Sequence, residues 1–175
     1  PLVSWARKMC IRDRIFLDID LFNSGSRPAI DVGISVSRVG GSAQTKAMKK
    51  VAGTLKIDQA QFRELEAFTK FGGDMDPVTA LTIDKGQKNA ALLVQPQYSP
   101  VPVEKQIAIL YCGTNGLLKN VPINQVHEFE SDFLQILETQ YNDSVLDQLR
   151  KGIINDDVTN ILRKVAEEIS GRYKN

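Results

Sequence analysis

The pattern of hydrophobic and polar positions changes about a quarter of the way along the chain. Residues 15–19 and 34–37 are short runs rich in β-branched and aromatic side chains, separated by a loop of Ser, Gly and Pro. Such runs are typical of strands. Gly40 and Gly41 then interrupt the pattern. From about residue 43 the apolar residues recur at three- and four-residue steps, the period of an amphipathic helix.

Start and stop signals divide the helical part. Asp58 with Gln61 three residues later predicts one helix start, and Asp76 before Pro77 predicts another. We expect Gly86 to end the helix that begins at Pro77. The spacing of apolar residues predicts further helices over residues 43–51, 103–112, 122–137, 144–150 and 156–169.

These elements predict an α/β remnant followed by an all-α domain. Two strands alone would be marginally stable, so residues 15–43 fit the end of an α/β nucleotide-binding domain whose sheet continues elsewhere. Residues 44–175 then form a helical bundle. The exposed edge of such a partial sheet would be prone to aggregation.

Composition excludes several function classes. Lys and Arg number 22 against 21 Asp and Glu, so the net charge of +1 gives no attraction to nucleic acid or to an anionic membrane. No apolar run approaches the ~18 residues that a membrane span requires. Cys10 and Cys112 lack the spacing of a zinc site or a disulfide framework. His127 is the single histidine, and we expect a surface residue there.

Motifs for catalysis are few. The sequence contains no phosphate-loop motif of the G-x-x-x-x-G-K-[ST] type. Asp74 and Asp76 resemble the start of a calcium loop, but Pro77 follows at once and Lys85 stands where the loop needs a glutamate. We therefore expect no metal site.

Arg38 is the strongest candidate for chemistry. It ends the alternating stretch Ser35-Val36-Ser37-Arg38 and precedes two glycines, so it could project past the edge of a sheet. The planar guanidinium offers five donors, which suit a phosphate group. The residues alone favour the alternative, a surface arginine in an ordinary salt bridge.

Four stretches, in order along the chain, carry a resemblance to a known family. Residues 27–49 read RPAIDVGISVSRVGGSAQTKAMK, residues 60–65 AQFREL, residues 71–76 FGGDMD and residues 95–100 QPQYSP. The chain resembles the alpha subunit of F-type ATP synthases from about residue 15 onward, most densely to about residue 116. The resemblance implies a C-terminal fragment of that subunit, which alternates with beta subunits around a rotating gamma stalk.

The resemblance also implies roles for individual residues. Arg38 matches the arginine that reaches the phosphates held by the adjacent beta subunit, an arginine finger. Ser35 matches a position needed for activity. We expect its hydroxyl to seat the segment that carries Arg38, although plain packing is an alternative. The fragment itself is expected to be inactive alone.

A second, non-catalytic nucleotide site is implied by four other matches. Arg27, Pro28, Gln95 and Gln97 match positions around the adenine of that site. The full-length subunit would hold ATP or ADP with Mg²⁺ there, whereas this fragment is expected to bind nucleotide weakly or not at all. Without the resemblance, Gln95 and Gln97 would be interpreted as solvated loop residues.

Partners and location follow from the same resemblance. Asp74 and Asp76 match a loop that faces the gamma stalk, although Asp76 also fits a simple helix cap. Other stator subunits would be neighbours too. The expected location is peripheral, on the cytoplasmic face of the bacterial inner membrane, in a head that drives proton or sodium transport. The alternatives are a fragment of another ring ATPase, such as an RNA helicase, or a structural helical interaction module.

The first 14 residues depart from the family. Residues 9–14 read MCIRDR, which one reading frame of a common sequencing adapter encodes. We therefore expect residues 1–14 to be non-native and poorly packed, and Trp5 to have no functional role.

Overall fold

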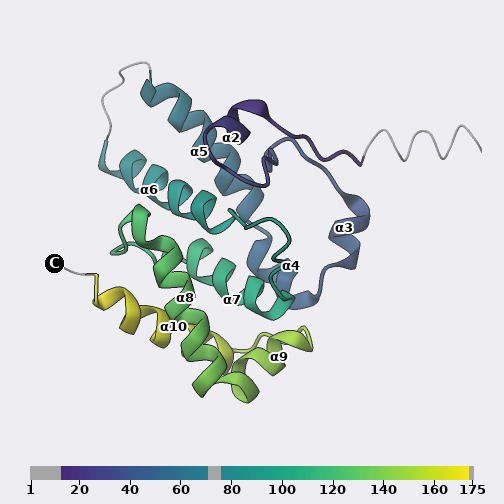
Figure 1. Cartoon of the computed structure of the whole chain (residues 1–175), viewed down its shortest axis with the longest axis vertical. Coiled ribbons are helices and arrows are strands. Elements are labelled where there is room, and N and C mark those ends of the chain that lie inside the picture. Colours follow the sequence, from purple (N-terminus) through teal and green to yellow (C-terminus); the bar gives the residue numbers. More distant parts are fainter. Residues whose placement is uncertain (1–12, 71–75, 174–175) are drawn as a thin grey trace, which may run out of the picture.

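The structure, a computed structural model, describes residues 13–70 and 76–173. Within these ranges it is mostly helical, and helices α5 to α10 form a bundle (Figure 1). The α-helices are α2 (Ile19–Asn23), α3 (Arg38–Ala43), α4 (Lys46–Ala52), α5 (Leu55–Lys70), α6 (Pro77–Leu92), α7 (Val103–Thr114), α8 (Val126–Gln140), α9 (Asp147–Arg150) and α10 (Asp156–Gly171). A 3₁₀ turn at Ile123–Gln125 precedes α8, and a π-helical turn at Asn142–Leu146 precedes α9.

Side-chain caps define where several helices begin. Asp76 accepts a hydrogen bond from the Thr79 N–H at 3.0 Å, with Pro77 at the first helical position. Asn155 does the same for α10 by accepting from the Val158 N–H at 2.9 Å. Such caps satisfy backbone donors that have no partner within the helix. The predicted starts at Asp76 and near residue 156 are therefore confirmed.

The hydrophobic core is centred on α7, α8 and α10, and α4 and α9 also contribute buried residues to it. Phe129 and Phe133 of α8 are fully buried and stack with ring centroids 5.8 Å apart. Ile107 and Cys112 of α7 belong to the same cluster. The predicted apolar stripes thus face one common core, which fixes the bundle on which the N-terminal part of the chain rests.

Residues 13–44, which we call the arm, run along the outside of this bundle. The arm carries α2 and α3, and Figure 1 shows α2 beside α5 and α3 standing away from the core helices. Its apolar side chains are largely exposed, with Leu17, Ile19 and Val39 at 75%, 74% and 71% of their full accessibility.

The two predicted strands are wrong. Within the described residues the arm forms only two isolated antiparallel bridges, Arg14 with Val36 and Leu17 with Ile30. A strand is stabilised by continuous pairing with a neighbour, and no further strand is present among the described residues to extend either bridge. Asp18 and Ser37 instead cap the short helices α2 and α3.

Two of the predicted helix limits are also wrong. Helix α5 begins at Leu55, so Asp58 lies in its first turn rather than at its cap. Helix α6 continues through Gly86 to Leu92. Gly86 is buried against Phe62 of α5, and a Cβ added to Gly86 would lie 2.4 Å from the Phe62 Cγ. The glycine therefore allows close packing of α5 on α6 instead of ending a helix.

None of the helices among residues 13–70 and 76–173 is both long enough and apolar enough to cross a membrane.

Candidate functional site

Arg38 lies at the start of a helix and not at the end of a strand. Ser37 caps α3 by accepting a hydrogen bond from the Gly40 N–H at 3.0 Å, and Arg38 is the first helical residue. Arg38 is exposed, and within the described part of the chain its side chain makes no ion pair or hydrogen bond. The alternative of an ordinary salt bridge within this chain is therefore wrong for the described residues.

Ser35 joins two parts of the arm. Its hydroxyl accepts a hydrogen bond from the Phe16 N–H at 3.0 Å and donates one to the Asp31 carbonyl. The backbone of Val36, the next residue, pairs in both directions with Arg14 at 2.9 Å. Ser35 is thus fixed through its side chain, three residues before Arg38.

Arg27, Pro28 and Gln95 come together at one cavity. This cavity, of about 560 Å³, lies between the arm and helices α5 and α6. Phe62 and Arg63 of α5 also line it. It offers apolar surface together with amide and guanidinium groups, as ligand sites for planar heterocycles do. Ser35 and Arg38 lie outside its lining.

A backbone contact ties the two predicted adenine-contacting loops to each other. The Gln95 N–H donates to the Arg27 carbonyl at 2.8 Å. The Arg27 guanidinium carbon lies 4.5 Å from the centroid of the Phe22 ring, which is cation–π geometry. The loop before Pro28 and the loop after α6 therefore form one wall of the cavity.

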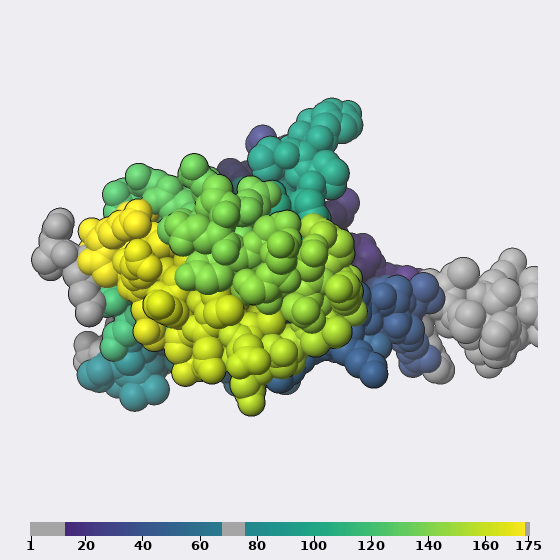
Figure 2. Space-filling model, turned by 90° about the horizontal axis from the view of Figure 1, so that it is seen from below, coloured from purple at the N-terminus to yellow at the C-terminus, as the bar shows by residue number. Residues whose placement is uncertain are grey.

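Gln97 lies apart from Arg27, Pro28 and Gln95. It lies in an exposed turn next to Tyr98, which has a φ of 61° and is 94% exposed. The loop between α6 and α7 projects from the molecule (Figure 2). Gln97 is not among the residues that line the 560 Å³ cavity.

Of the two predicted rotor-facing acids, only Asp76 can be described. It is exposed, and its hydrogen bonds with Thr79 lower the pKa of its carboxyl. Asp74 and most of the stretch 71–76 lie outside the described residues, as do residues 1–12 of the predicted non-native segment.

Comparison with known proteins decides the family. The family described as "ATP synthase alpha/beta chain, C terminal domain" matches residues 44–169. The chain belongs to this family. It is 71% identical over 156 residues to the ATP synthase subunit alpha of Parabacteroides distasonis, covering 89% of this chain and 30% of the relative. It is 64% identical over 161 residues to that of Phocaeicola vulgatus, covering 92% and 30%.

A more distant ATP synthase subunit alpha, from Christiangramia forsetii, is 59% identical over 162 residues, covering 93% of this chain and 31% of the relative. The predicted resemblance to the alpha subunit is thereby confirmed. The chain spans about 30% of the length of the curated ATP synthase relatives it matches.

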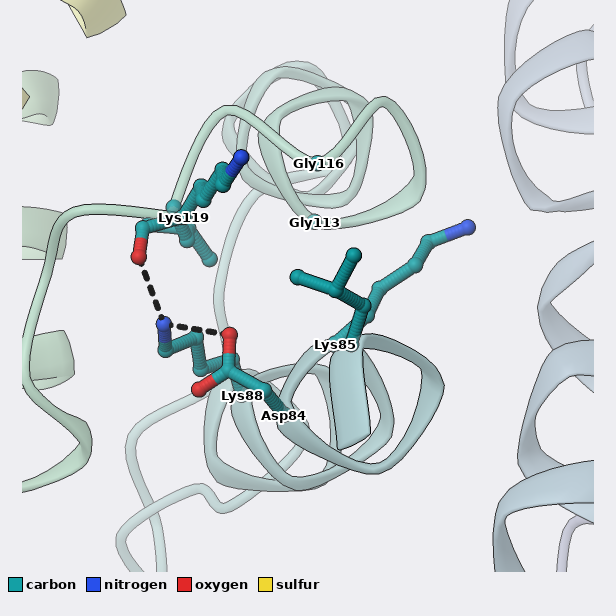
Figure 3. A pocket seen from close by; sticks show the side chains of 8 residues that line it. Asp84, Lys85, Lys88, Gly113, Gly116 and Lys119 are labelled. Atoms are coloured by element: carbon teal, nitrogen blue, oxygen red, sulfur yellow. Dashed lines mark hydrogen bonds and ion pairs between the residues drawn. The ribbon is translucent and has the colours of Figure 1, made fainter. Parts of the chain in front are cut away.

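In a second, smaller cavity of this ATP synthase domain, the buried lysine among the lining residues is already paired with groups of the chain itself. The cavity encloses about 150 Å³ between α6 and the end of α7. Figure 3 shows the Lys88 ammonium between the Asp84 carboxylate, at 2.7 Å, and the Lys119 carbonyl, at 3.1 Å. Lys88 is 5% exposed, so this pairing satisfies a buried charge and explains the polar groups there.

No group of three or more His, Cys, Asp or Glu side chains among residues 13–70 and 76–173 could hold a metal ion. Cys112 is fully buried in the core, and burial raises the pKa of its thiol. Cys112 is therefore a packing residue.

The contacts that hold the arm on the bundle were not predicted from the sequence. Asp31 is 8% exposed and forms an ion pair with Arg63 of α5. Lys56, two helical turns earlier, donates to the Ser35 carbonyl at 2.8 Å. Lys56 precedes the helix start predicted at Asp58, so no helical spacing linked it to Arg63, and nothing in the sequence alone connects the two cations to residues 31 and 35.

Proposed function

We propose that this chain is the part of an ATP synthase alpha subunit that donates Arg38 to the catalytic site of the adjacent beta subunit. Family membership and identities of 59–71% to alpha subunits support the assignment to this subunit. The exposed Arg38 side chain, free of partners among the described residues, is the observation that carries the proposal. A charge placed in this way is available to a group on another subunit.

Arg38 would act as an arginine finger. Its guanidinium would counter the negative charge that develops on the transferring phosphoryl group, and its planar fork can bind two oxygens at once. Ser35 would keep the finger in place, because its hydroxyl links Phe16 to Asp31 just before α3. Arginine fingers contribute about 10³- to 10⁵-fold in rate.

The 560 Å³ cavity would receive the adenine of a nucleotide that is bound but not turned over. Arg27, Pro28 and Gln95 line it, and an amide can both donate to and accept from a purine edge. Gln97 would join only after movement of its exposed loop. Phosphates and Mg²⁺ would be held by residues outside this sequence, which contains no phosphate loop. We therefore propose that this chain alone holds ATP or ADP weakly.

The proposed setting is the head of a rotary motor. Beta subunits would alternate with this subunit, and the gamma stalk would pass near Asp74 and Asp76. We propose a peripheral place on the cytoplasmic face of the bacterial inner membrane, with membrane contact through the other subunits and coupling to protons or sodium ions.

The test is ATP hydrolysis by an alpha–beta–gamma complex whose alpha subunit carries residues 15–175 of this chain. Arg38→Ala should lower the turnover number by at least about 10³-fold, and Arg38→Lys should restore only a small part, because an ammonium is a point charge. Arg163→Ala, at an exposed arginine on α10, is the matched control and should leave turnover unchanged. A loss below about threefold for Arg38→Ala in an assembled complex would refute the finger.

A further inference from the structure

One face of α5 meets the arm through three residues. Lys56, Ala60 and Arg63 follow one another at steps of four and three, which places them in a single row on the helix surface. Seven residues span about 10 Å along the helix axis. The row therefore extends beneath the stretch of the arm that leads to α3.

At one end of the row, Arg63 binds a turn of the arm. Its guanidinium forms an ion pair with Oδ2 of Asp31 and lies 3.9 Å from Oδ2 of Asp18. The other oxygen of Asp31 accepts hydrogen bonds from the N–H groups of Gly33 and Ile34, at 2.9 and 3.3 Å. The carboxylate thus connects α5 directly to the backbone of residues 31–34.

The middle and the far end of the row continue the contact. A Cβ at Gly33 would lie 3.8 Å from the Cβ of Ala60, so two small residues let the arm approach the helix. The Lys56 ammonium donates to the carbonyl of Ser35 at 2.8 Å. Lys56 therefore holds the backbone only three residues from Arg38.

We propose that Lys56 and Arg63 are positioning residues for the Arg38 finger, and this inference rests on the proposed function. Among the described residues, the arm has no strand pairing beyond two isolated bridges. The Gln95–Arg27 backbone hydrogen bond holds it near Pro28, and side-chain contacts to α5 hold the stretch that leads to Arg38. The Arg63 side chain is 30% exposed but that of Asp31 is only 11% exposed, so removing Arg63 also costs some stability. In an assembled complex the loss of turnover should come from geometry, because a misplacement of about 1 Å can cost a catalytic group up to about 100-fold.

The test uses the same alpha–beta–gamma complex. Arg63→Gln should lower the turnover number about tenfold and Lys56→Gln about threefold, with the KM for ATP unchanged. Arg63→Lys keeps the charge and should recover part of the loss. In the Arg38→Ala background, neither substitution should lower turnover further, because residues that act through one group are not additive.

Lys85→Gln is the matched control. Lys85 forms an ion pair with Asp58 of α5 at 2.9 Å and, among the described residues, makes no hydrogen bond or ion pair to the arm, so its loss should leave turnover unchanged. If Arg38→Ala has no effect, both the function and the positioning role are refuted. If Arg38→Ala is deleterious and Arg63→Gln and Lys56→Gln behave like Lys85→Gln, only the positioning role is refuted. Equal losses with and without Arg38 would also refute it, because they indicate a general structural effect.

Discussion

Replacing Gly86 by alanine tests how closely α5 packs on α6. Alanine is favoured over glycine inside a helix by about 1 kcal/mol, so at an open position Gly86→Ala would stabilise the chain. At Gly86 the new methyl group would meet three atoms of Phe62, the nearest at 2.4 Å and the others at 2.5 Å. These distances are well below van der Waals contact, so the packing must change.

The magnitude follows from which Phe62 atoms are involved. One of them is its Cβ, which no side-chain rotation moves, so the helices must separate. Inserting a methyl group into a packed site costs about 1–3 kcal/mol, and this contact belongs to the upper half of that range. After the propensity gain is subtracted, we expect Gly86→Ala to lower the free energy of unfolding by about 1–2 kcal/mol.

Urea unfolding of the chain, followed by circular dichroism at a helical band, measures this change. For a slope of about 2 kcal/mol per molar, the midpoint should fall by about 0.5–1 M. Gly171→Ala is the control, because Gly171 ends α10 with nothing within 4 Å of an added Cβ, and its midpoint should stay or rise slightly. In a Phe62→Ala background, Gly86→Ala should cost less but stay destabilising, because the Cβ of residue 62 remains 2.5 Å from the new methyl group. A raised midpoint for Gly86→Ala alone would show that the α5–α6 contact is looser than described.

Two further predictions concern titratable groups. Burial raises the pKa of Glu104, but hydrogen bonds from its own backbone and from Arg150 outweigh burial and hold the pKa below its ordinary value of 4.5. The stabilisation from this carboxylate is therefore present above about pH 4.5 and lost as pH falls through the lower, folded-state pKa; urea midpoints of wild type and Glu104→Gln should differ at pH 7 and converge in acid. Because burial raises the pKa of the Cys112 thiol, Cys112 in a Cys10→Ser background should react with a thiol reagent at pH 8 only after unfolding, and rapid labelling of the native chain would contradict its place in the core.

The helical part was largely predictable because its signals are local. Asp76, Pro77 and the apolar rows of α7 and α10 each specify a helix through neighbouring residues. Gly86 misled because its role depends on Phe62, which is 24 residues away in the sequence (86 minus 62). A glycine that ends a helix and a glycine that permits close packing look alike in sequence.

The strands failed for a different reason. β-branched residues favour extended backbone, but pairing is a non-local property. Asp18 and Ser37 had a local alternative, since their oxygens cap helices α2 and α3. At the site, the resemblance supplied Arg27, Pro28 and Gln95, which the structure brings to one cavity. The resemblance did not indicate Lys56 and Arg63 of α5, because their partners, the Ser35 carbonyl and the Asp31 carboxylate, are distant in the sequence.

The exposed apolar side chains of the arm affect how strongly its conformation is determined. Leu17, Ile19 and Val39 are each more than 70% accessible, and covering one such side chain contributes about 1.5–3 kcal/mol. A surface that covered all three would add about 4.5–9 kcal/mol, comparable to the whole stability of a small domain. Docking onto such a surface would thus hold the backbone of the arm in one conformation. The position of Arg38 would then be fixed only when that surface is present.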